Sequence, residues 1–342
     1  MTDRNMAALC QQRWNNIAKP IGSLGQLENV VCRLAAIQGT LEVNIDRRVC
    51  LVMCADNGVL QEGVAQTPAF VTASQSVSIA KGKASVNAMA RAVHCDVVAV
   101  DVGINTDVDA PELIRRKAGH GTGNIARGPA MTEAQLEQTL HTGMELVQEM
   151  KERGYQIICT GEMGIGNTTT TSAVTSVLLG IDPLTITGRG AGLSDEGLAR
   201  KLDAINRAIA INQPDRENPM DVLRKVGGFD IVALTGIFLG GQRYRVPIVV
   251  DGVISAVSAL AAVRIQPACA DYLIASHLSR EPSAALVLQE LGLTPLLHAD
   301  MALGEGTGAV ALLPLLDVAL AVYRQNSTYE QLDYLPPEMQ KP

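Results

Sequence analysis

Val49-Cys50-Leu51-Val52-Met53, followed by Asp56-Asn57-Gly58, decides the fold, because an unbroken apolar run ends there in polar residues beside a glycine. Apolar runs that do not alternate with polar residues are typical of strands buried on both faces. Four further runs have the same pattern: Val97–Val100, Gln156–Cys159, Val246–Val250 and Tyr272–Ile274. Five such strands indicate a parallel sheet that helices cover on both sides.

Helical patterns lie between these runs. Thr132 and Gln135 form a capping-box pattern that opens a helix, and Gly154 closes it. Ser194-Asp195-Glu196 predicts a second helix start, and a short helix follows the loop Asn212–Pro219 and ends at Gly227-Gly228. Because strands and helices alternate, the sequence predicts an α/β, doubly wound fold.

Ligands of such folds bind beyond the carboxyl ends of the strands. Each of the five runs ends in a polar cluster, namely Asp56-Asn57-Gly58, Asp101-Val102-Gly103, Gly161-Glu162, Asp251-Gly252 and Ser276-His277. The sequence therefore predicts a ligand site at this edge of the sheet.

A glycine-flanked carboxylate occurs in Leu303-Gly304-Glu305-Gly306-Thr307-Gly308, just before the apolar run Ala309–Leu313. Glycine on both sides lets a ligand approach the backbone closely, and an apolar surrounding suits a general base. The stretch by itself also fits an ordinary helix-entry turn with a solvated glutamate. A second stretch of the same kind, Gly161–Thr170, favours the functional interpretation.

Two glycine-rich stretches, Gly161–Gly166 and Gly188–Gly192, are candidates for binding phosphate through exposed backbone N–H groups. Lys201 follows the second stretch by about two helical turns. Its residue type and position favour a solvated surface charge, with a phosphate contact as the alternative.

The composition of the chain restricts the kind of partner that the protein can bind. The net charge of −7 argues against nucleic acid and anionic membranes, so a small molecule is expected. The seven cysteines lie mostly in apolar context, as in a reduced, cytoplasmic protein, and no zinc-ligand spacing predicts a metal. No signal peptide is visible, and the long apolar runs Ile248–Ile265 and Ala309–Tyr323 are interrupted by charged residues or proline, so no membrane span is expected.

Motifs of other enzyme classes are missing from the sequence. There is no Gly-x-Ser-x-Gly elbow for a hydrolase triad around His277 and no Gly-x-x-x-x-Gly-Lys-Ser/Thr loop for a nucleoside triphosphatase. A nicotinamide dehydrogenase remains an alternative from the strand–glycine pattern, although its fingerprint does not follow the first strand.

The chain resembles the nicotinate-nucleotide:dimethylbenzimidazole phosphoribosyltransferase family over nearly its whole length. The resemblance is carried by colinear stretches, namely Lys19–Gly25, Cys54–Val59, Glu62–Val64, Gly161–Thr170, Gly188–Gly192, Gly227–Asp230, Val250–Gly252, Tyr272–Ser279 and Leu303–Gly308. It implies a Rossmann-like, mainly parallel sheet in a large domain, residues 45–277. It also implies a smaller, mainly helical domain from both chain ends, residues 1–44 plus 278–342, and a homodimer.

The resemblance also implies roles for individual residues. It places the general base on Glu305 and a second catalytic carboxylate on Glu162. It places the nucleotide on Gly164, Gly190, Lys201 and Ser279, near the Gly304 and Gly306 backbone, and the benzimidazole on Thr67, Gln75 and Leu303. The chain departs from the family pattern at Asn57 and Ala302, both near the expected base pocket.

The implied reaction transfers 5-phosphoribosyl from nicotinate mononucleotide to 5,6-dimethylbenzimidazole or a related base, with inversion at C1′ and no cofactor. It yields α-ribazole 5′-phosphate and nicotinate, and it serves nucleotide-loop assembly in cobalamin biosynthesis. Adenine, a substituted benzimidazole or a phenol are alternative acceptors. A catalytically silent relative that binds nucleotide or benzimidazole is the alternative function.

Overall fold

The computed structural model describes residues 2–334 and contains one parallel sheet. Its strands are β1 (Arg48–Ala55), β2 (Cys95–Gly103), β3 (Ile114–Arg115), β4 (Ile157–Met163), β5 (Ile248–Val250) and β6 (Leu273–Ala275). All neighbouring strands pair in parallel, in the order β3-β2-β1-β4-β5-β6. The five predicted strands are confirmed. No sequence pattern indicated β3, because two residues at a sheet edge are too short for one.

Every strand except the short β3 contributes to a core on both faces of the sheet. In β1, Leu51 and Met53 point into one apolar core, whereas Cys50 and Val52 point into the other. All eight residues of β1 are buried. This alternation explains the unbroken apolar run, since successive side chains of a strand point to opposite faces and both faces are covered.

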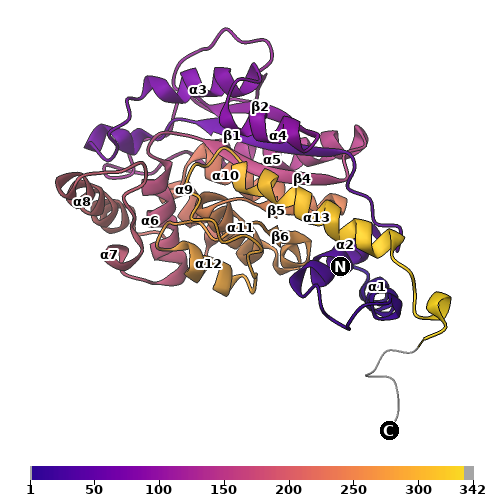
Figure 1. Ribbon diagram of the computed structural model, residues 1–342. Coiled ribbons are helices and arrows are strands. Elements are labelled where there is room, and N and C mark those ends of the chain that lie inside the picture. Colours follow the sequence, from indigo (N-terminus) through magenta and orange to yellow (C-terminus); the bar gives the residue numbers. More distant parts are fainter. Residues whose placement is uncertain (1, 335–342) are drawn as a thin grey trace.

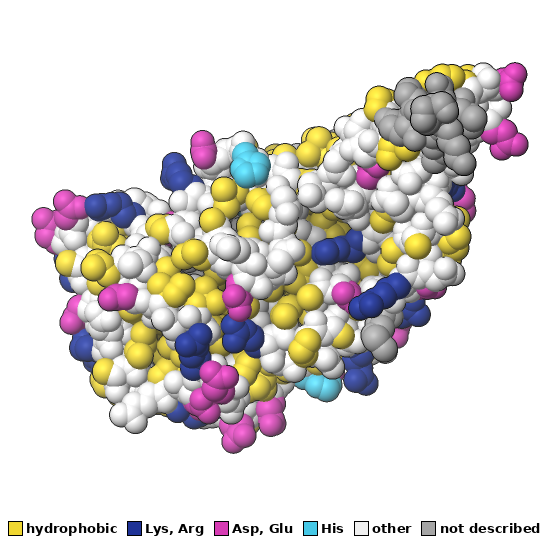
Figure 2. Space-filling view, turned by 90° about the horizontal axis from the view of Figure 1, so that it is seen from below, with side chains coloured by type: hydrophobic (Ala, Val, Ile, Leu, Met, Phe, Trp, Pro, Cys, Tyr) yellow, Lys and Arg dark blue, Asp and Glu magenta, His cyan; other side chains and the backbone are white. Residues whose placement is uncertain are grey.

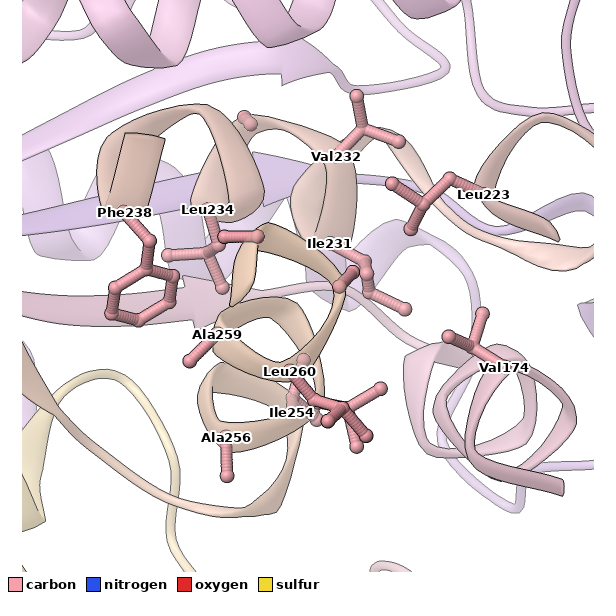
Figure 3. Packing of buried hydrophobic residues seen from close by; sticks show 14 of the residues in the cluster. Val174, Leu223, Ile231, Val232, Leu234, Phe238, Ile254, Ala256, Ala259 and Leu260 are labelled. Atoms are coloured by element: carbon pink, nitrogen blue, oxygen red, sulfur yellow. The ribbon is translucent and has the colours of Figure 1, made fainter. Parts of the chain in front are cut away.

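The first face is covered by helices from the middle of the chain. These are α5 (Glu133–Glu152), α6 (Asn167–Leu179), α8 (Asp195–Asn212), α9 (Pro219–Val226), α10 (Phe229–Tyr244), α11 (Val253–Ile265) and α12 (Ala284–Glu290), with the short α7 (Pro183–Ile186) against α6 and α8. Figure 3 shows Ile231 and Leu234 of α10 beside Leu260 of α11 in this core. Both helices are apolar on nearly every side, as buried helices are.

The second face is covered by helices from both ends of the chain and by two helices after β1. These are α1 (Arg4–Asn16), α2 (Gln26–Gln38), α3 (Phe70–Ala80), α4 (Ser85–Ala92) and α13 (Thr307–Gln325). In Figure 1, α13 runs along α2 and past α4, and both contacts are present. The chain ends therefore share one core with the sheet. The division into two domains stays a prediction, and its residues 335–342 lie outside the described part.

The predicted helix starts are confirmed. Thr132 caps α5 by accepting a hydrogen bond from the Gln135 N–H, and Ser194 caps α8 in the same way from Gly197. The loop before α9 ends at Asn218, which caps that helix. These boundaries were predictable because a cap depends on side chains within four residues of each other.

One helix, α13, has the length and apolar composition of a membrane span. More than half of its most apolar window is buried inside the protein. Its Asp317 carboxylate pairs with the Arg48 guanidinium at the start of β1, at 2.8 Å. In this structure α13 is therefore a core helix.

On the face seen in Figure 2, positive and negative side chains are interspersed rather than separated into one basic surface.

The centre of the sheet is its switch point. From β1 the chain continues to β2 on one side, whereas β4 continues to β5 on the other. The connections therefore diverge between β1 and β4, which leaves a crevice beyond their carboxyl ends. Glu162 lies next to the last residue of β4, at this point.

Candidate active site

A cleft with a volume of about 200 Å³ opens beyond β4 and β5. Its ionisable lining residues are Glu162, Asp251, Glu281 and Glu305, together with His277. Within residues 2–334, no Lys or Arg lines this cleft. The cleft is therefore acidic and suits a ligand with positive charge.

Glu305 lies on a loop that requires glycine at both neighbouring positions. Gly304, Glu305 and Gly306 all have positive φ angles, of 84°, 63° and 93°. A Cβ on Gly306 would lie 2.4 Å from Cys50 Sγ and 3.0 Å from the Thr160 carbonyl oxygen, so only glycine fits there. The loop turns the Glu305 carboxylate inward, and the residue is buried. The interpretation of Glu305 as a solvated side chain is wrong.

Two neutral donors hold the Glu305 carboxylate. Gln75 Nε2 of α3 donates to Oε1 at 2.5 Å, and the Val86 N–H donates to Oε2 at 3.3 Å. Val86 lies in the first turn of α4, where free N–H groups favour negative charge. Glu305 is thus a fixed acceptor at the cleft wall.

Glu162 is linked to a second buried carboxyl group. Asn167 Nδ2, in the first turn of α6, donates to Glu162 Oε2 and, at 3.0 Å, to Asp230 Oδ2. Burial, with Asp230 as the next cause, raises the pKa of Glu162 to about 8. Burial also raises the pKa of Asp230 to about 6. Glu162 therefore carries a proton at neutral pH, and Asp230 is mostly ionised.

Asp251 connects the end of β5 to the helix that follows Glu305. Its Oδ1 accepts the Ala309 N–H of α13 at 2.8 Å. Burial raises the pKa of Asp251, and the neighbouring His277 ring opposes this effect. A Cβ on Gly308 would lie 1.9 Å from His277 Nδ1, so the ring packs directly on the start of α13. Asp251 and His277 thereby fix the helix start beside Glu305.

Lys201 of α8 is fully buried, so its interpretation as a solvated surface charge is wrong. Its ammonium group donates to Thr168 Oγ1 at 3.0 Å and to the Gly188 carbonyl oxygen at 2.9 Å. Burial lowers the pKa of Lys201 to about 8, and the charge of Glu281 opposes this shift. The helical pattern of α8 did not reveal this, because burial of Lys201 depends on α6 and the 188–192 segment.

The glycines at 188–192 border a second hollow of about 690 Å³ that shares Gly190, Ala191, Glu281 and Ala302 with the cleft, and Lys201 is buried behind Gly188. Arg189 and Arg280 line this hollow. A Cβ on Gly190 would lie 3.0 Å from Thr168 Oγ1, the hydroxyl that Lys201 contacts. The two adjoining hollows therefore have an acidic end at Glu162 and Glu305 and a basic end at Arg189 and Arg280.

The structure brings most of the remaining predicted residues to this space. Gly164, Ser279, Leu303 and Gly304 line the cleft, Ser279 buried and Leu303 exposed at the rim. Gly161 lies inside β4 rather than in a loop, so it offers no free N–H cradle there. Thr67 does not line the cleft; it lies with Asp56 and Asn57 in a separate hollow of about 550 Å³. Its contact with benzimidazole stays a prediction.

Sequence reasoning missed four polar residues at or behind the cleft. Asn167 and Asp230 occurred in quoted motifs without a role, and Asp251 and His277 were recognised only as strand-end residues. Two glycines that pack against Asp230 are the sequence feature that could have pointed to this residue. A Cβ on Gly164 would lie 2.8 Å from Asp230 Oδ2, and one on Gly228 would lie 2.5 Å from Asp230 Oδ1.

Comparison with known proteins defines the class. A family model described as "Phosphoribosyltransferase" matches residues 1–332. A nicotinate-nucleotide–dimethylbenzimidazole phosphoribosyltransferase of Ruminiclostridium cellulolyticum is 47% identical over 319 residues, which are 93% of this chain and 91% of that protein. One of Acetivibrio thermocellus is 44% identical over 322 residues, 94% and 92% of the two chains.

Solved structures agree. The crystal structure of CobT from Thermus thermophilus superposes with a TM-score of 0.92 at 40% identity and covers 97% of this chain and 99% of that one. The chain is thus an α/β phosphoribosyltransferase, an enzyme of the glycosyltransferase type. It belongs to the nicotinate-nucleotide–dimethylbenzimidazole phosphoribosyltransferase family.

Proposed function

We propose that the enzyme transfers 5-phosphoribosyl from nicotinate mononucleotide to 5,6-dimethylbenzimidazole, giving α-ribazole 5′-phosphate and nicotinate. This reaction builds the nucleotide loop of cobalamin. The names of the relatives supply both substrates. The observation that carries the proposal for this chain is the buried Glu305 carboxylate, held by Gln75 and Val86 at the wall of an acidic cleft.

The charge distribution supports one orientation of the donor. The pyridinium ring of the nucleotide is cationic and suits the end of the cleft that holds Glu162, Asp251 and Glu305. The phosphate is anionic and suits the end that Arg189, Arg280 and the glycines at 188–192 line, with Lys201 buried behind Gly188. The ribose then lies between them, near Gly164 and Ser279, and C1′ faces the carboxylates.

Glu305 acts as the general base in this scheme. The ring leaves as nicotinate, whose nitrogen takes the electron pair of the broken bond and becomes neutral, so its departure needs no general acid. The attacking azole nitrogen becomes cationic as it bonds to C1′, because the other ring nitrogen still carries a proton. Removal of that proton by Glu305 stabilises the charge, and such a base contributes about 10²- to 10⁴-fold in rate. Attack opposite the leaving pyridine inverts C1′.

Glu162 has a different role from Glu305. As a carboxylate beside C1′ it would stabilise the positive charge that develops there, or accept hydrogen bonds from the ribose hydroxyls. Because its pKa is raised to about 8, Glu162 must lose a proton at neutral pH before it carries this charge. The scheme needs neither a metal nor a cofactor.

Product analysis tests the proposal. The protein is incubated with nicotinate mononucleotide and a panel of bases, namely dimethylbenzimidazole, unsubstituted benzimidazole, adenine and a phenol, and the products are identified by mass spectrometry. We expect α-ribazole 5′-phosphate as the main product, with equimolar nicotinate. Binding of both substrates without nicotinate release would instead support the silent, ligand-binding alternative.

The family resemblance also leads us to propose a cytoplasmic homodimer in which the partner helps to close each site. Light scattering after size-exclusion chromatography measures the mass in solution. A monomer of 36.2 kDa that is fully active would contradict this part of the proposal.

A further inference from the structure

Asp230 is a buried carboxyl group that lies behind the cleft wall. It is fully buried in the first turn of α10 and is not part of the cleft lining. Its Oδ1 accepts the Ile231 N–H at 3.0 Å, and its Oδ2 accepts Asn167 Nδ2 at 3.0 Å. Asp230 therefore reaches the cleft only through other side chains.

Asn167 links Asp230 to the Glu162 side chain in the cleft. An amide nitrogen has two hydrogens, and Asn167 Nδ2 donates to Asp230 and to Glu162. Gly304 packs directly against the Glu162 carboxyl group, because a Cβ on Gly304 would lie 2.7 Å from Glu162 Oε1. Two carboxyl groups are thus held at a fixed separation by one amide.

The charged groups that face Glu162 are all acidic. They are Asp230 of α10, Asp251 after β5 and Glu305 before α13, and Asn167 of α6 contributes a neutral donor. Burial and the Asp230 charge raise the pKa of Glu162 to about 8, and burial raises that of Asp230 to about 6. Near pH 7 Glu162 is therefore mainly protonated, whereas Asp230 is mostly ionised.

We propose that Asp230 is a positioning residue that keeps the Glu162 carboxyl protonated in the empty cleft, so that binding of a nucleotide with a cationic ring expels this proton. The inference rests on the proposed function, which supplies the pyridinium cation. On binding, the O–H bond of Glu162 breaks and the proton passes to the buffer. The carboxylate that remains faces the ring, and no electrons are transferred.

Isothermal titration calorimetry tests this inference directly. Nicotinate mononucleotide is titrated without an acceptor base at pH 7.5, in two buffers of different ionisation enthalpy, and the difference in heat gives the number of protons released. A group with a pKa of about 8 supplies at most about 0.8 proton at this pH. We expect a release approaching that value for the unmodified protein and less than half of it for Asp230→Asn.

Two further variants identify the source of the proton. Glu162→Gln removes the titrating group, so its release should fall to the background. Asp101→Asn is the matched control, because Asp101 is a buried aspartate with a raised pKa that pairs with Lys117 and does not line the cleft. Its proton release should equal that of the unmodified protein.

Lys201 also affects the number of protons measured on binding. Its pKa of about 8 should rise when phosphate binds, and it would then take up a proton. Ribose 5-phosphate carries the same phosphate without the cationic ring. Its proton count is therefore subtracted from that of the nucleotide.

The outcomes separate the inference from the proposed function. Failure of the nucleotide to bind would contradict the proposed function. Binding without proton release, or with equal release in Asp230→Asn, would overturn the inference alone, since a purely structural Asp230 would change affinity but not the proton count. If Asp230→Asn does not fold, a series from pH 6.5 to 9.5 on the unmodified protein decides. Release that does not decline above about pH 8 would overturn the inference.

Discussion

Gln75 Nε2 and Glu305 Oε1 form a 2.5 Å hydrogen bond, although 230 residues separate them in the sequence. The bond joins α3, on the second face of the sheet, to the loop before α13. With the Val86 N–H on the other oxygen, it orients the carboxylate before any substrate arrives. The acceptor azole would then meet a base that is already in place, which lowers the cost of reaching the transition state.

The first prediction concerns this base. Glu305→Gln should lower kcat by about 10²- to 10⁴-fold, because an amide does not remove the azole proton. The nucleotide Kd should change little, since the amide keeps the size of the side chain. Steady-state kinetics and calorimetry measure both quantities. Glu145→Gln, at an exposed glutamate of α5, is the control, and a near-normal kcat for Glu305→Gln would refute the role.

The second prediction concerns Lys201, which is buried at the basic end of the site. Lys201→Met keeps the volume of the buried side chain and removes its charge, so KM for nicotinate mononucleotide should rise about 10-fold or more. KM for dimethylbenzimidazole should change far less. Initial rates with each substrate varied in turn provide the comparison. An equal rise in both KM values would rule out a phosphate contact by Lys201.

The third prediction concerns Gly304, which has a φ angle of 84° and abuts Glu162. Gly304→Ala should reduce kcat strongly, because the new Cβ would lie 2.7 Å from Glu162 Oε1 and displace that carboxyl. Gly82 has a φ angle of 72°, and a Cβ there would meet no atom within 4 Å, so Gly82→Ala shares the backbone cost of about 1 kcal/mol without the collision. Activity assays and thermal unfolding of both variants compare the two effects. Equal loss of activity in both would show that backbone strain alone is responsible.

The fourth prediction concerns the pH dependence of stability. The pKa of Glu162 is about 8 in the folded state, against 4.5 for an ordinary glutamate. Between these values the folded state binds more protons than the unfolded state, so the free energy of unfolding falls as pH rises. Glu162→Gln removes this contribution. Relative to the unmodified protein, the free energy of unfolding of Glu162→Gln should therefore rise by up to about 1.4 kcal/mol for each pH unit in this window.

Urea unfolding at pH 5, 6.5 and 8 measures this difference. Asp230 and Asp251 also have raised pKa values, so part of the slope should remain in Glu162→Gln. Parallel stability curves for the two proteins would mean that Glu162 titrates normally in the folded state.

Local patterns made much of the fold predictable. The strand at Val49–Met53 and the start of α5 at Thr132 depend on residues within a few positions of one another, so the sequence revealed both. The glycine-flanked Glu305 was visible for the same reason, since its loop needs glycine at both neighbours. The resemblance to a known family extended the predictions to Glu162, Lys201 and Ser279, but it gave no role to Asn167 or Asp230.

Other features required the tertiary structure. The sequence pattern of α8 places Lys201 on a helix, but only the packing of that helix against α6 buries it. Likewise, no spacing predicts that Asn167 bridges Glu162 and Asp230, because the three residues come from α6, β4 and α10. Strand and helix propensities are local, whereas burial and the charge states that follow from it depend on which distant segments meet. By itself, therefore, the sequence determined the five longer strands, the helix starts at Thr132 and Ser194, and the carboxylate of Glu305 on its glycine loop. The fold decided which carboxyl groups one amide bridges and which lysine is buried.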